Sequence, residues 1–447
     1  MPNRSRQGRT EQTRSHGAGA ADHVARAKQR AFCIGVLESG DDGDELAELK
    51  ELLRTAGVAV VGQELQNREQ VHPNTYVGPG KLEEIKELAK AADANFVAVD
   101  DELSPRQERN MEGVLGMPVV DRTATILDIF AAHAHSAEGK LQVELAQLQY
   151  NMARMRGLWT HLERLGGVSS GGFATRGPGE SQIETDRRLA RNRISALKAR
   201  LEEVKGTRAT MRAERERAHL PQIALAGYTN AGKSTLLNQL TGAEVGVRDR
   251  LFHTLDPTTR TWRLLGRTYL VTDTVGFIRK LPHQLVQAFG ATLEETRRAD
   301  LILHVVDASA EDEDREEMMR AVDEVLEEIG AGDRPRLLVL NKMDALEPDA
   351  QEVLQRRFPD AVMLSAATGE GIESFGERIA EEFERRLQDI ELLLPFQEGA
   401  RLAELHDIVG DLEREDTPDG VRVKARVPQG VAERYGRFVV ADSAPAT

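Results

Sequence analysis

The chain has 447 residues, of which 40% are hydrophobic and 30% charged, and its formal net charge is −15. At about 150 residues per domain this length predicts roughly three domains, and no apolar run reaches the roughly 20 residues that a membrane-spanning helix needs. The acidic balance argues against the whole chain being a general polyanion binder, so DNA is not an expected partner.

The start of the chain and its single cysteine indicate a compartment. The first 30 residues contain no apolar signal segment, and Cys33 is the only cysteine, so neither secretion nor a disulfide is expected. The expected location is the cytoplasm, with peripheral membrane association left open. Residues 1–30 carry seven Lys or Arg and two Asp or Glu. They predict a disordered basic tail that is either solvated or in contact with RNA.

Strand-like and helix-like segments alternate over residues 31–135. Apolar strand-like runs begin at Phe32, Val58 and Phe96, and a helix-like run follows each of them. This alternation predicts a small N-terminal α/β domain. The turn Gly78-Pro-Gly-Lys81 precedes one helix-like run, and a glycine turn with a lysine at a helix start can bind an anion. It is either a second nucleotide site or an ordinary turn.

Residues 136–220 carry the longest helical pattern of the chain. Apolar residues recur at spacings of four and three at Leu141, Leu145, Leu148, Met152, Met155, Trp159 and Leu162, and again at Ala190, Ile194, Leu197, Leu201 and Val204. The segment between them, residues 165–180, is too rich in glycine to be helical. We therefore predict an antiparallel helical hairpin with a Gly-rich tip.

The same region is basic, with fifteen Lys or Arg against eight Asp or Glu in residues 151–220. The tip 175–180 is flanked by Arg187, Arg188, Arg191 and Arg193. This arrangement is either a basic probe for phosphate-rich surfaces or a solvated helix face beside an ordinary loop.

Five strand-like segments alternate with helices over residues 221–387. They begin at Ile223, Thr268, Leu301, Arg336 and Ala361, and they predict a doubly wound, mostly parallel sheet. The last part, residues 388–447, combines a helix-like stretch with the alternating run VRVKARV. It predicts a small α+β C-terminal domain.

A glycine-rich motif follows the first of these strands. Residues 227–234, GYTNAGKS, match GxxxxGK[ST] between a strand-like and a helix-like run, which is the context that a P-loop requires. The backbone N–H groups of such a loop wrap the phosphates, its lysine reaches the β- and γ-phosphates, and its serine supplies an oxygen to Mg²⁺. The predicted contacts are Gly227, Tyr228, Thr229, Asn230, Ala231, Gly232, Lys233, Ser234 and Thr235.

Two further segments are predicted to contact the metal and the γ-phosphate. They are Phe252, His253, Thr254, Leu255 and Asp256, and the DxxG motif Asp273, Thr274, Val275 and Gly276. Thr254 is the predicted hydroxyl ligand of Mg²⁺, with Thr258 and Thr259 as rivals, and Asp273 is placed on the outer shell of the metal. The predicted metal site is Ser234, Thr254 and Asp273, and the predicted catalytic residues are Lys233, Thr254 and Gly276.

The sequence also indicates which base is bound. Asn341, Lys342, Met343 and Asp344 follow the strand RLLVL, and Ser365, Ala366 and Ala367 follow AVML. The Asp344 carboxylate can accept hydrogen bonds from guanine N1–H and the exocyclic amine, Lys342 can lie along the base, and Asn341 can brace the loop. A backbone N–H of residues 365–367 can reach guanine O6. Adenine offers no such pairing, so GTP is the predicted substrate.

The residue after the DxxG motif departs from GTPases of the Ras kind. Those enzymes carry a glutamine there to orient the attacking water, whereas this chain has Phe277. Phenylalanine neither donates nor accepts a hydrogen bond. We therefore expect slow intrinsic hydrolysis and a catalytic element supplied by a partner, a loop or RNA, although Phe277 can equally serve packing.

These motifs, together with DDELSPRQERN, DRTATILDIF, EGKLQVELAQLQY and TRGPGESQIETDRR, resemble those of the HflX family of ribosome-associated GTPases. The resemblance extends from about residue 32 onward. It implies an α/β fold class: a P-loop GTPase sheet of the TrmE–Era–Obg type with an N-terminal α/β domain, a helical linker and a small C-terminal domain. It also implies binding to the large ribosomal subunit and its rRNA and, as in some members, ATP binding through the N-terminal domain.

The expected function is therefore that of a GTPase that acts on the large ribosomal subunit in protein synthesis, either in the rescue or splitting of stalled ribosomes or in ribosome assembly. The expected state is a monomer that associates with the ribosome. The alternative is a GTP-dependent regulatory switch that binds a protein partner. A basic helical hairpin favours RNA, whereas a protein partner favours an apolar stripe left over after the hairpin has packed.

Overall fold

The computed structural model describes residues 29–37, 46–154, 182–217, 220–243, 251–252, 254–282, 285–286, 290–409 and 412–440. The predicted tail up to residue 28 and the Gly-rich tip 165–180 lie outside these ranges. The described residues form two compact units, and the chain passes from the first to the second between Ile129 and Phe130.

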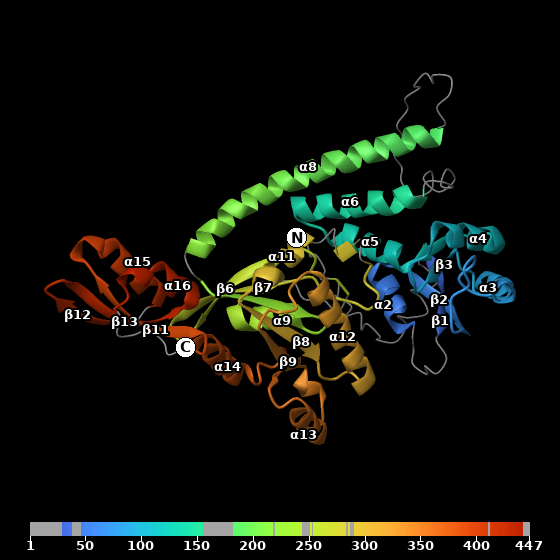
Figure 1. Cartoon of the computed structure of the whole chain (residues 1–447). Coiled ribbons are helices and arrows are strands. Elements are labelled where there is room, and N and C mark those ends of the chain that lie inside the picture. Colours follow the sequence, from blue (N-terminus) through green and yellow to red (C-terminus); the bar gives the residue numbers. More distant parts are fainter. Residues whose placement is uncertain are drawn as a thin grey trace, which may run out of the picture. The chain divides into compact units, whose positions relative to one another are not determined.

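The first unit is a parallel sheet with strand order β2-β1-β3-β4; Figure 1 shows it in blue with its helices. Its strands are β1 (Arg30–Leu37), β2 (Ala59–Asn67), β3 (Phe96–Val99) and β4 (Val119–Asp121), and its helices are α2 (Ala47–Thr55), α3 (Pro79–Ala91), α4 (Pro105–Leu115) and the greater part of α5 (Arg122–His133). Along β1, Phe32 and Ile34 belong to one apolar cluster and Ala31 and Cys33 to another. Alternate side chains therefore fill the two faces of the sheet, as the βα alternation of the sequence predicts.

The turn Gly78-Pro-Gly-Lys81, considered above as a second nucleotide site, is engaged within this unit. The Gly78 N–H donates to Gln66 Oε1 at 2.8 Å, and Lys81 Nζ lies 2.6 Å from Glu64 Oε1 and 3.2 Å from Glu84 Oε2. An anion at the start of α3 would have to displace two carboxylates from Lys81. The geometry therefore favours the ordinary turn.

The predicted helical hairpin belongs to the second unit. Helices α6 (Ala137–Arg154) and α8 (Gln182–Arg217) lie side by side and antiparallel (Figure 1). Their apolar stripes meet in one cluster that contains Leu141, Leu145, Leu148, Met152, Ile194, Leu197 and Leu201. These seven residues of the predicted seam are thus confirmed. Ala190 and Val204 are described but do not belong to the cluster, and Met155, Trp159 and Leu162 lie outside the described residues.

The main sheet of the second unit has the strand order β10-β9-β8-β5-β7-β6. Its strands are β5 (Gln222–Gly227), β6 (Thr258–Leu264), β7 (Arg267–Asp273), β8 (Leu301–Asp307), β9 (Arg336–Asn341) and β10 (Val362–Met363). All neighbouring pairs are parallel except β6 with β7. Helices α9 (Lys233–Thr241), α11 (Gly290–Arg298), α12 (Asp312–Glu328), α13 (Pro348–Arg357) and α14 (Ile372–Glu384) accompany the strands. The predicted doubly wound sheet is confirmed.

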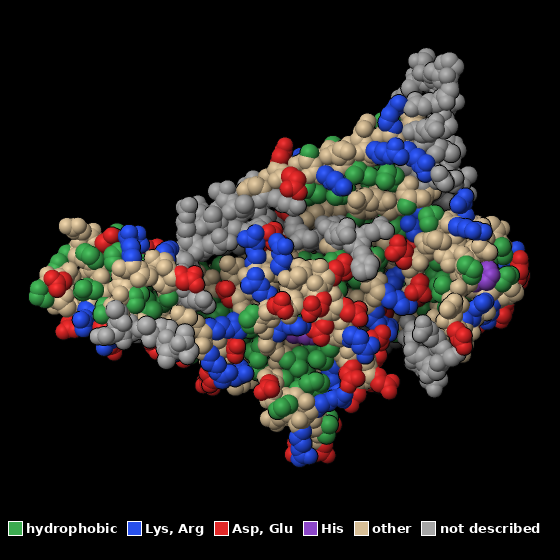
Figure 2. Space-filling model, viewed as in Figure 1, with side chains coloured by type: hydrophobic (Ala, Val, Ile, Leu, Met, Phe, Trp, Pro, Cys, Tyr) green, Lys and Arg blue, Asp and Glu red, His purple; other side chains and the backbone are tan. Residues whose placement is uncertain are grey.

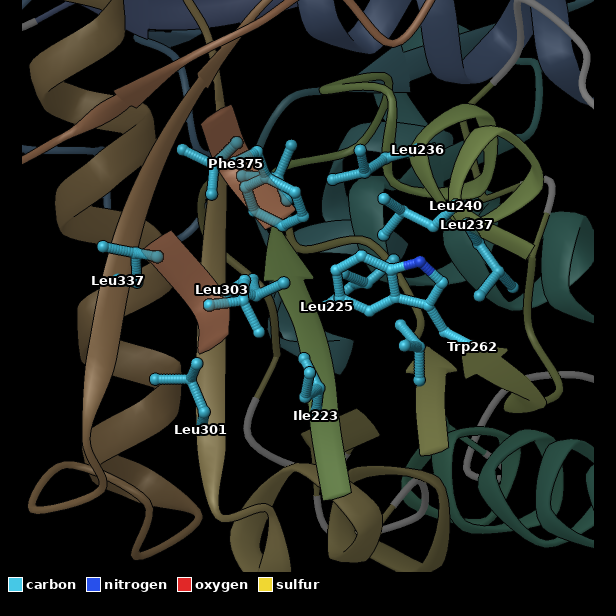
Figure 3. Packing of buried hydrophobic residues seen from close by; sticks show 14 of the residues in the cluster. Ile223, Leu225, Leu236, Leu237, Leu240, Trp262, Leu301, Leu303, Leu337 and Phe375 are labelled. Carbon is cyan, nitrogen blue, oxygen red and sulfur yellow. The ribbon is translucent and has the colours of Figure 1, made fainter. Parts of the chain in front are cut away.

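An aromatic group anchors the core on one face of this sheet. Figure 3 shows Trp262 of β6 among Leu236, Leu237 and Leu240 of α9, which begins at the end of the glycine-rich loop. The Trp262 ring stacks on Phe375 with centroids 6.0 Å apart. This packing fixes α9 against the sheet, and with it the position of the loop that precedes the helix.

The C-terminal part forms a small antiparallel sheet with strand order β11-β13-β12. Its elements are β11 (Leu387–Leu394), α15 (Gly399–Val409), β12 (Glu413–Thr417), β13 (Gly420–Pro428) and α16 (Gln429–Arg434). Val421, Val423, Ala425 and Val427 of β13 are buried at every second position, which confirms the predicted α+β pattern. In the part of the chain that the structure describes, no helix is both long and apolar enough to cross a bilayer.

Candidate nucleotide-binding site

The glycine-rich loop leaves the carboxyl end of β5 and enters α9 at Lys233. Gly232 has a φ of 92°, and a Cβ at this residue would lie 2.1 Å from Asn341 Nδ2. Asn341 Nδ2 donates to the Ala231 carbonyl oxygen at 2.8 Å. Only glycine allows this approach, so the loop is held against the base-recognition segment at the end of β9.

Lys233 is buried beneath this loop. Its Nζ donates to the carbonyl oxygens of Gly227 and Tyr228 at 3.0 and 2.8 Å. Burial lowers the pKa of Lys233 to about 8, although the nearby Asp273 carboxylate opposes this shift. The ammonium is therefore held in a dry site, where its attraction for a phosphate is strong.

Three oxygen-bearing side chains that were predicted to bind the metal lie together. Ser234 Oγ donates to Asp273 Oδ2 at 2.5 Å and is hydrogen bonded to Thr254 Oγ1 at 2.9 Å. Desolvation is the main cause of a raised pKa at Asp273, and Lys233 and the surrounding donors oppose it. Asp273 Oδ1 is buried and has no hydrogen-bond partner among the described residues. Such an oxygen set suits Mg²⁺, directly or through water.

The rival threonines lie in a different environment. Thr258 and Thr259 belong to β6, which pairs with β7, and the Thr259 hydroxyl is hydrogen bonded to that of Thr272 at 2.9 Å. Thr254 instead precedes the strand and contacts the loop serine. The geometry therefore favours Thr254 over both alternatives.

Phe277 pairs with the glycine-rich loop through its backbone. Its N–H donates to the Gly227 carbonyl oxygen at 3.1 Å, and its carbonyl oxygen accepts from the Thr229 N–H at 2.7 Å. The Phe277 side chain is fully buried. The residue therefore has a packing role, and its side chain is not available to orient water.

The segment predicted to recognise the base is braced from both sides. The Asn341 side chain also accepts from the Ala366 N–H at 2.9 Å, so one asparagine joins its own loop to the glycine-rich loop and to residues 365–367. Lys342 has a φ of 65°, and its Nζ lies 2.6 Å from Asp307 Oδ2. Asp344 is exposed in the short helix Met343–Ala345. Its carboxylate can therefore meet a base that arrives from solvent.

The backbone N–H groups of residues 365–367 are not equivalent. The Ser365 N–H donates to the Glu370 carbonyl oxygen at 2.9 Å, and that of Ala366 is used by Asn341. Within the described residues, no hydrogen bond engages the N–H of Ala367, which is exposed. Of the three, Ala367 is therefore the candidate donor to guanine O6.

Several side chains predicted to touch the nucleotide are engaged elsewhere. The Phe252 ring packs edge-to-face on Phe130, with centroids 4.6 Å apart. The Asp256 carboxylate accepts from the Ser136 N–H at 2.7 Å. The Thr274 hydroxyl donates to the Leu225 carbonyl oxygen at 2.7 Å. The side chains of Leu255, Val275 and Met343 are buried, and His253 lies outside the described residues.

The Phe252 side chain thus has Phe130 of α5 as its partner, and the Asp256 side chain has Ser136 at the start of α6. The predicted nucleotide contacts of these two residues stay predictions. The Tyr228 hydroxyl also has a protein partner, because it accepts from the Arg279 N–H at 2.8 Å. By contrast, the Thr229 hydroxyl is buried without a hydrogen-bond partner in the described part of the site, which suits a ligand contact.

The sequence analysis missed Asp307, the partner of Lys342. Asp307 ends β8, just as Asp273 ends β7 and Asn341 ends β9. The carboxyl ends of parallel strands in one sheet share an edge, where ligands bind. The same rule applied to the run LILHVVD would have identified Asp307.

The fold and this site define a nucleoside-triphosphate-binding protein of the P-loop class, with the loops of a GTPase. Three family models match the chain: GTP-binding GTPase N-terminal over residues 43–131, GTP-binding GTPase Middle Region over residues 133–215, and 50S ribosome-binding GTPase over residues 222–342.

Individual relatives match the chain over nearly its whole length. The chain is 44% identical to GTPase HflX of Caldanaerobacter subterraneus over 94% of this chain and 96% of that protein. It is 47% identical to GTPase HflX of Lacrimispora saccharolytica over 90% and 94%, and 47% identical to GTPase HflX of Escherichia coli K12 over 90% and 94%. The chain belongs to the HflX family of GTPases, with a G domain of the 50S ribosome-binding type, and it binds and hydrolyses GTP.

Proposed function

We propose that this protein is a Mg²⁺-dependent GTPase that docks on the large ribosomal subunit in its GTP state and hydrolyses GTP rapidly only there. Ser234, Thr254 and Asp273 are the proposed metal-site residues, with Asp273 acting through water. No group of three or more His, Cys, Asp or Glu side chains suited to a metal occurs in the described ranges. Hydroxyl groups and the phosphates themselves would therefore supply most of the ligands, and bound Mg²⁺ would offset the phosphate charge.

The proposed roles of the protein groups follow from their positions. Lys233 holds the β- and γ-phosphates through its buried ammonium, and the Gly276 N–H meets the γ-phosphate. Asp344 and the Ala367 N–H select guanine, while Asn341 and the Lys342–Asp307 pair hold that segment in place. These groups bind and orient the nucleotide, and a loose phosphoryl-transfer transition state requires little more than positioning and charge stabilisation.

The buried side chain of Phe277 carries the proposal that hydrolysis needs help. Its backbone is fixed on the glycine-rich loop and its side chain is fully buried, so this position contributes no group that aligns the attacking water. Slow hydrolysis by the isolated protein is expected. A catalytic element supplied in trans can raise the rate by about 10³–10⁵.

Purified large ribosomal subunits from the same organism are expected to raise GTP turnover at least about tenfold, which corresponds to about 1.4 kcal/mol of barrier. The measurement is steady-state phosphate release with and without subunits, with small subunits as the control. No stimulation, together with no pelleting of the protein with subunits in a GTP analogue, would instead support the protein-partner switch.

The described face of α8 favours RNA over a protein partner. Its apolar positions Ala190, Ile194, Leu197 and Leu201 are buried, whereas Arg188, Arg191, Lys198 and Arg200 are exposed. Figure 2 shows Lys and Arg side chains along this helix. Leu189 is the exposed large hydrophobic residue among the described side chains of α8. A single leucine is not the stripe that a protein partner would need.

Replacing Arg187, Arg188 and Arg191 together with alanine is expected to weaken binding to the large subunit about tenfold or more and to flatten its dependence on salt, because fewer counterions are released. Arg193 is left in place because its Nη2 lies 2.7 Å from Glu144 Oε1 of α6 and supports the hairpin. The measurement is subunit pelleting between low and moderate salt, with nucleotide affinity measured in parallel.

The matched control replaces Arg356, Arg385 and Arg414, whose side chains are 75%, 59% and 56% exposed in other parts of the second unit. The charge change is the same, so equal loss in both triple variants would indicate a nonspecific field effect. Lower GTP affinity in the α8 variant would indicate misfolding.

Ribosome splitting and subunit assembly, the two expected roles in the cytoplasm, differ in whether mature subunits or precursors are bound.

A further inference from the structure

The segment that carries Thr254 has a second attachment, away from the nucleotide. At one point Thr254 Oγ1 is hydrogen bonded to Ser234 Oγ at 2.9 Å. Two residues later, Asp256 reaches the short link between α5 and α6. Both attachments lie within the second unit. One short loop therefore joins the metal site to the first helix of the hairpin.

Asp256 binds the start of α6 through both carboxylate oxygens. Oδ2 accepts from the N–H groups of His135 and Ser136 at 3.1 and 2.7 Å, and the Ser136 hydroxyl donates to Oδ1. Ser136 in turn accepts from the Gly139 N–H at 2.8 Å, as an N-cap residue does. A carboxylate at a helix N-terminus is favoured by the N–H groups and by the helix dipole, so this contact is specific for a negative charge.

Phe252 provides a second contact on the same side. It has a φ of 56° and is buried, and its ring lies edge-to-face on Phe130 near the end of α5. A left-handed conformation is costly for a bulky residue and persists where the surroundings fix it. The ring contact and the carboxylate contact flank Thr254 and hold this loop from both ends.

Gly139 makes the close approach possible. A Cβ at this position would lie 2.5 Å from Asp256 Oδ1 and 3.1 Å from Ser136 Oγ. Glycine in the first turn of a helix costs stability relative to alanine. At this residue the glycine leaves space for the carboxylate of a distant loop.

We propose that Asp256 is a positioning residue that, docked on Ser136 at the start of α6, holds Thr254 beside Ser234 and couples the bound nucleotide to the helical hairpin. The inference rests on the proposed metal role of Thr254. A nucleotide that orders Thr254 then stabilises the contact at α6, and by linkage the contact at α6 raises the affinity for that nucleotide relative to GDP. GTP binding is thereby transmitted to the hairpin, which is the proposed contact to ribosomal RNA.

The decisive variant is Gly139→Ala, because it excludes the Asp256 carboxylate while improving the intrinsic helix propensity of α6. We expect the ratio of GTP-analogue affinity to GDP affinity to fall at least about fivefold, the lower range of allosteric coupling. We also expect hydrogen exchange of residues 137–154 to slow with the GTP analogue in the parent protein and to respond less in the variant. A purely structural role would leave the affinity ratio unchanged.

The matched control is Gly206→Ala on α8, where an added Cβ has no neighbour within 4 Å. It makes the same chemical change in the same hairpin, and we expect no change in the affinity ratio. If Gly139→Ala behaves like this control, the proposal is overturned.

A double-mutant cycle tests the contact itself. Asp256→Ala is expected to lower the affinity ratio more than Ser136→Ala, because the backbone N–H groups of His135 and Ser136 still meet the carboxylate in the serine variant. The double variant is expected to lower the ratio no further than Asp256→Ala alone. Additive losses would overturn the coupling through this pair. Thr254→Ala distinguishes the metal role of Thr254 from the coupling through Asp256. A changed affinity ratio in Thr254→Ala with an unchanged ratio in Gly139→Ala refutes the coupling alone. Unchanged ratios in both refute the metal role of Thr254, and the coupling with it.

Discussion

Replacing Asp344 with asparagine is expected to weaken GTP binding about 100-fold or more and to create a preference for xanthosine triphosphate. The carboxylate accepts hydrogen bonds from N1–H and the exocyclic amine of guanine, and charged hydrogen bonds of this kind contribute strongly to affinity. The asparagine amide can accept from N1–H of xanthine and donate to its second carbonyl group. Competition of both nucleotides against a fluorescent GTP analogue measures the change.

Asp349→Asn is the matched control for this substitution. Asp349 is exposed in the first turn of α13, beyond the segment that recognises the base, so the same loss of charge should leave GTP affinity nearly unchanged. Unchanged GTP affinity in the Asp344 variant would contradict the assigned role. A loss of both nucleotides would instead indicate that the braced loop around Asn341 had been disturbed.

The positions of the nucleotide-binding motifs in the fold could be predicted because their chemistry is local in sequence. Each motif follows a buried strand directly, so the sheet places Lys233, Asp273 and Asn341 at one edge without any further information. The packing of the two hairpin helices could also be predicted, because apolar residues at spacings of four and three form one stripe on each helix and two such stripes pack against each other. The fold class followed from the alternation of strand-like and helix-like runs along the chain.

The contacts that could not be predicted join residues far apart in the chain. Ser136 and Asp256 are 120 positions apart, and neither carries a motif that names the other. Asp256 lies two residues beyond Thr254, so proximity alone suggested a nucleotide contact. The structure shows that its carboxylate binds the start of α6, because three donors of His135 and Ser136 meet it there. Sequence reasoning therefore found the site but not its connection to the hairpin.

Replacing Gly276 with alanine is expected to lower GTP hydrolysis about 100-fold or more while GDP affinity changes little. A Cβ at Gly276 would lie 2.8 Å from Thr229 Cγ2, 2.9 Å from Thr229 Cα and 3.1 Å from Lys233 Nζ. Thr229 Cα belongs to the backbone of the glycine-rich loop and cannot move aside for the added Cβ as a flexible side chain could. Gly276 would therefore move away from the γ-phosphate, and one hydrogen-bond donor of this kind is worth about 10²–10³ in rate.

Single-turnover phosphate release and GDP titration distinguish this loss of catalysis from a loss of fold. Gly113→Ala on α4 is the matched control, since an added Cβ there has no neighbour within 4 Å. Normal hydrolysis by the Gly276 variant would show that this segment does not close on the γ-phosphate. GDP lacks the γ-phosphate, so a parallel fall in GDP affinity would show that the added Cβ disturbs Thr229 and the binding of the β-phosphate. Gly276 would then maintain the shape of the glycine-rich loop.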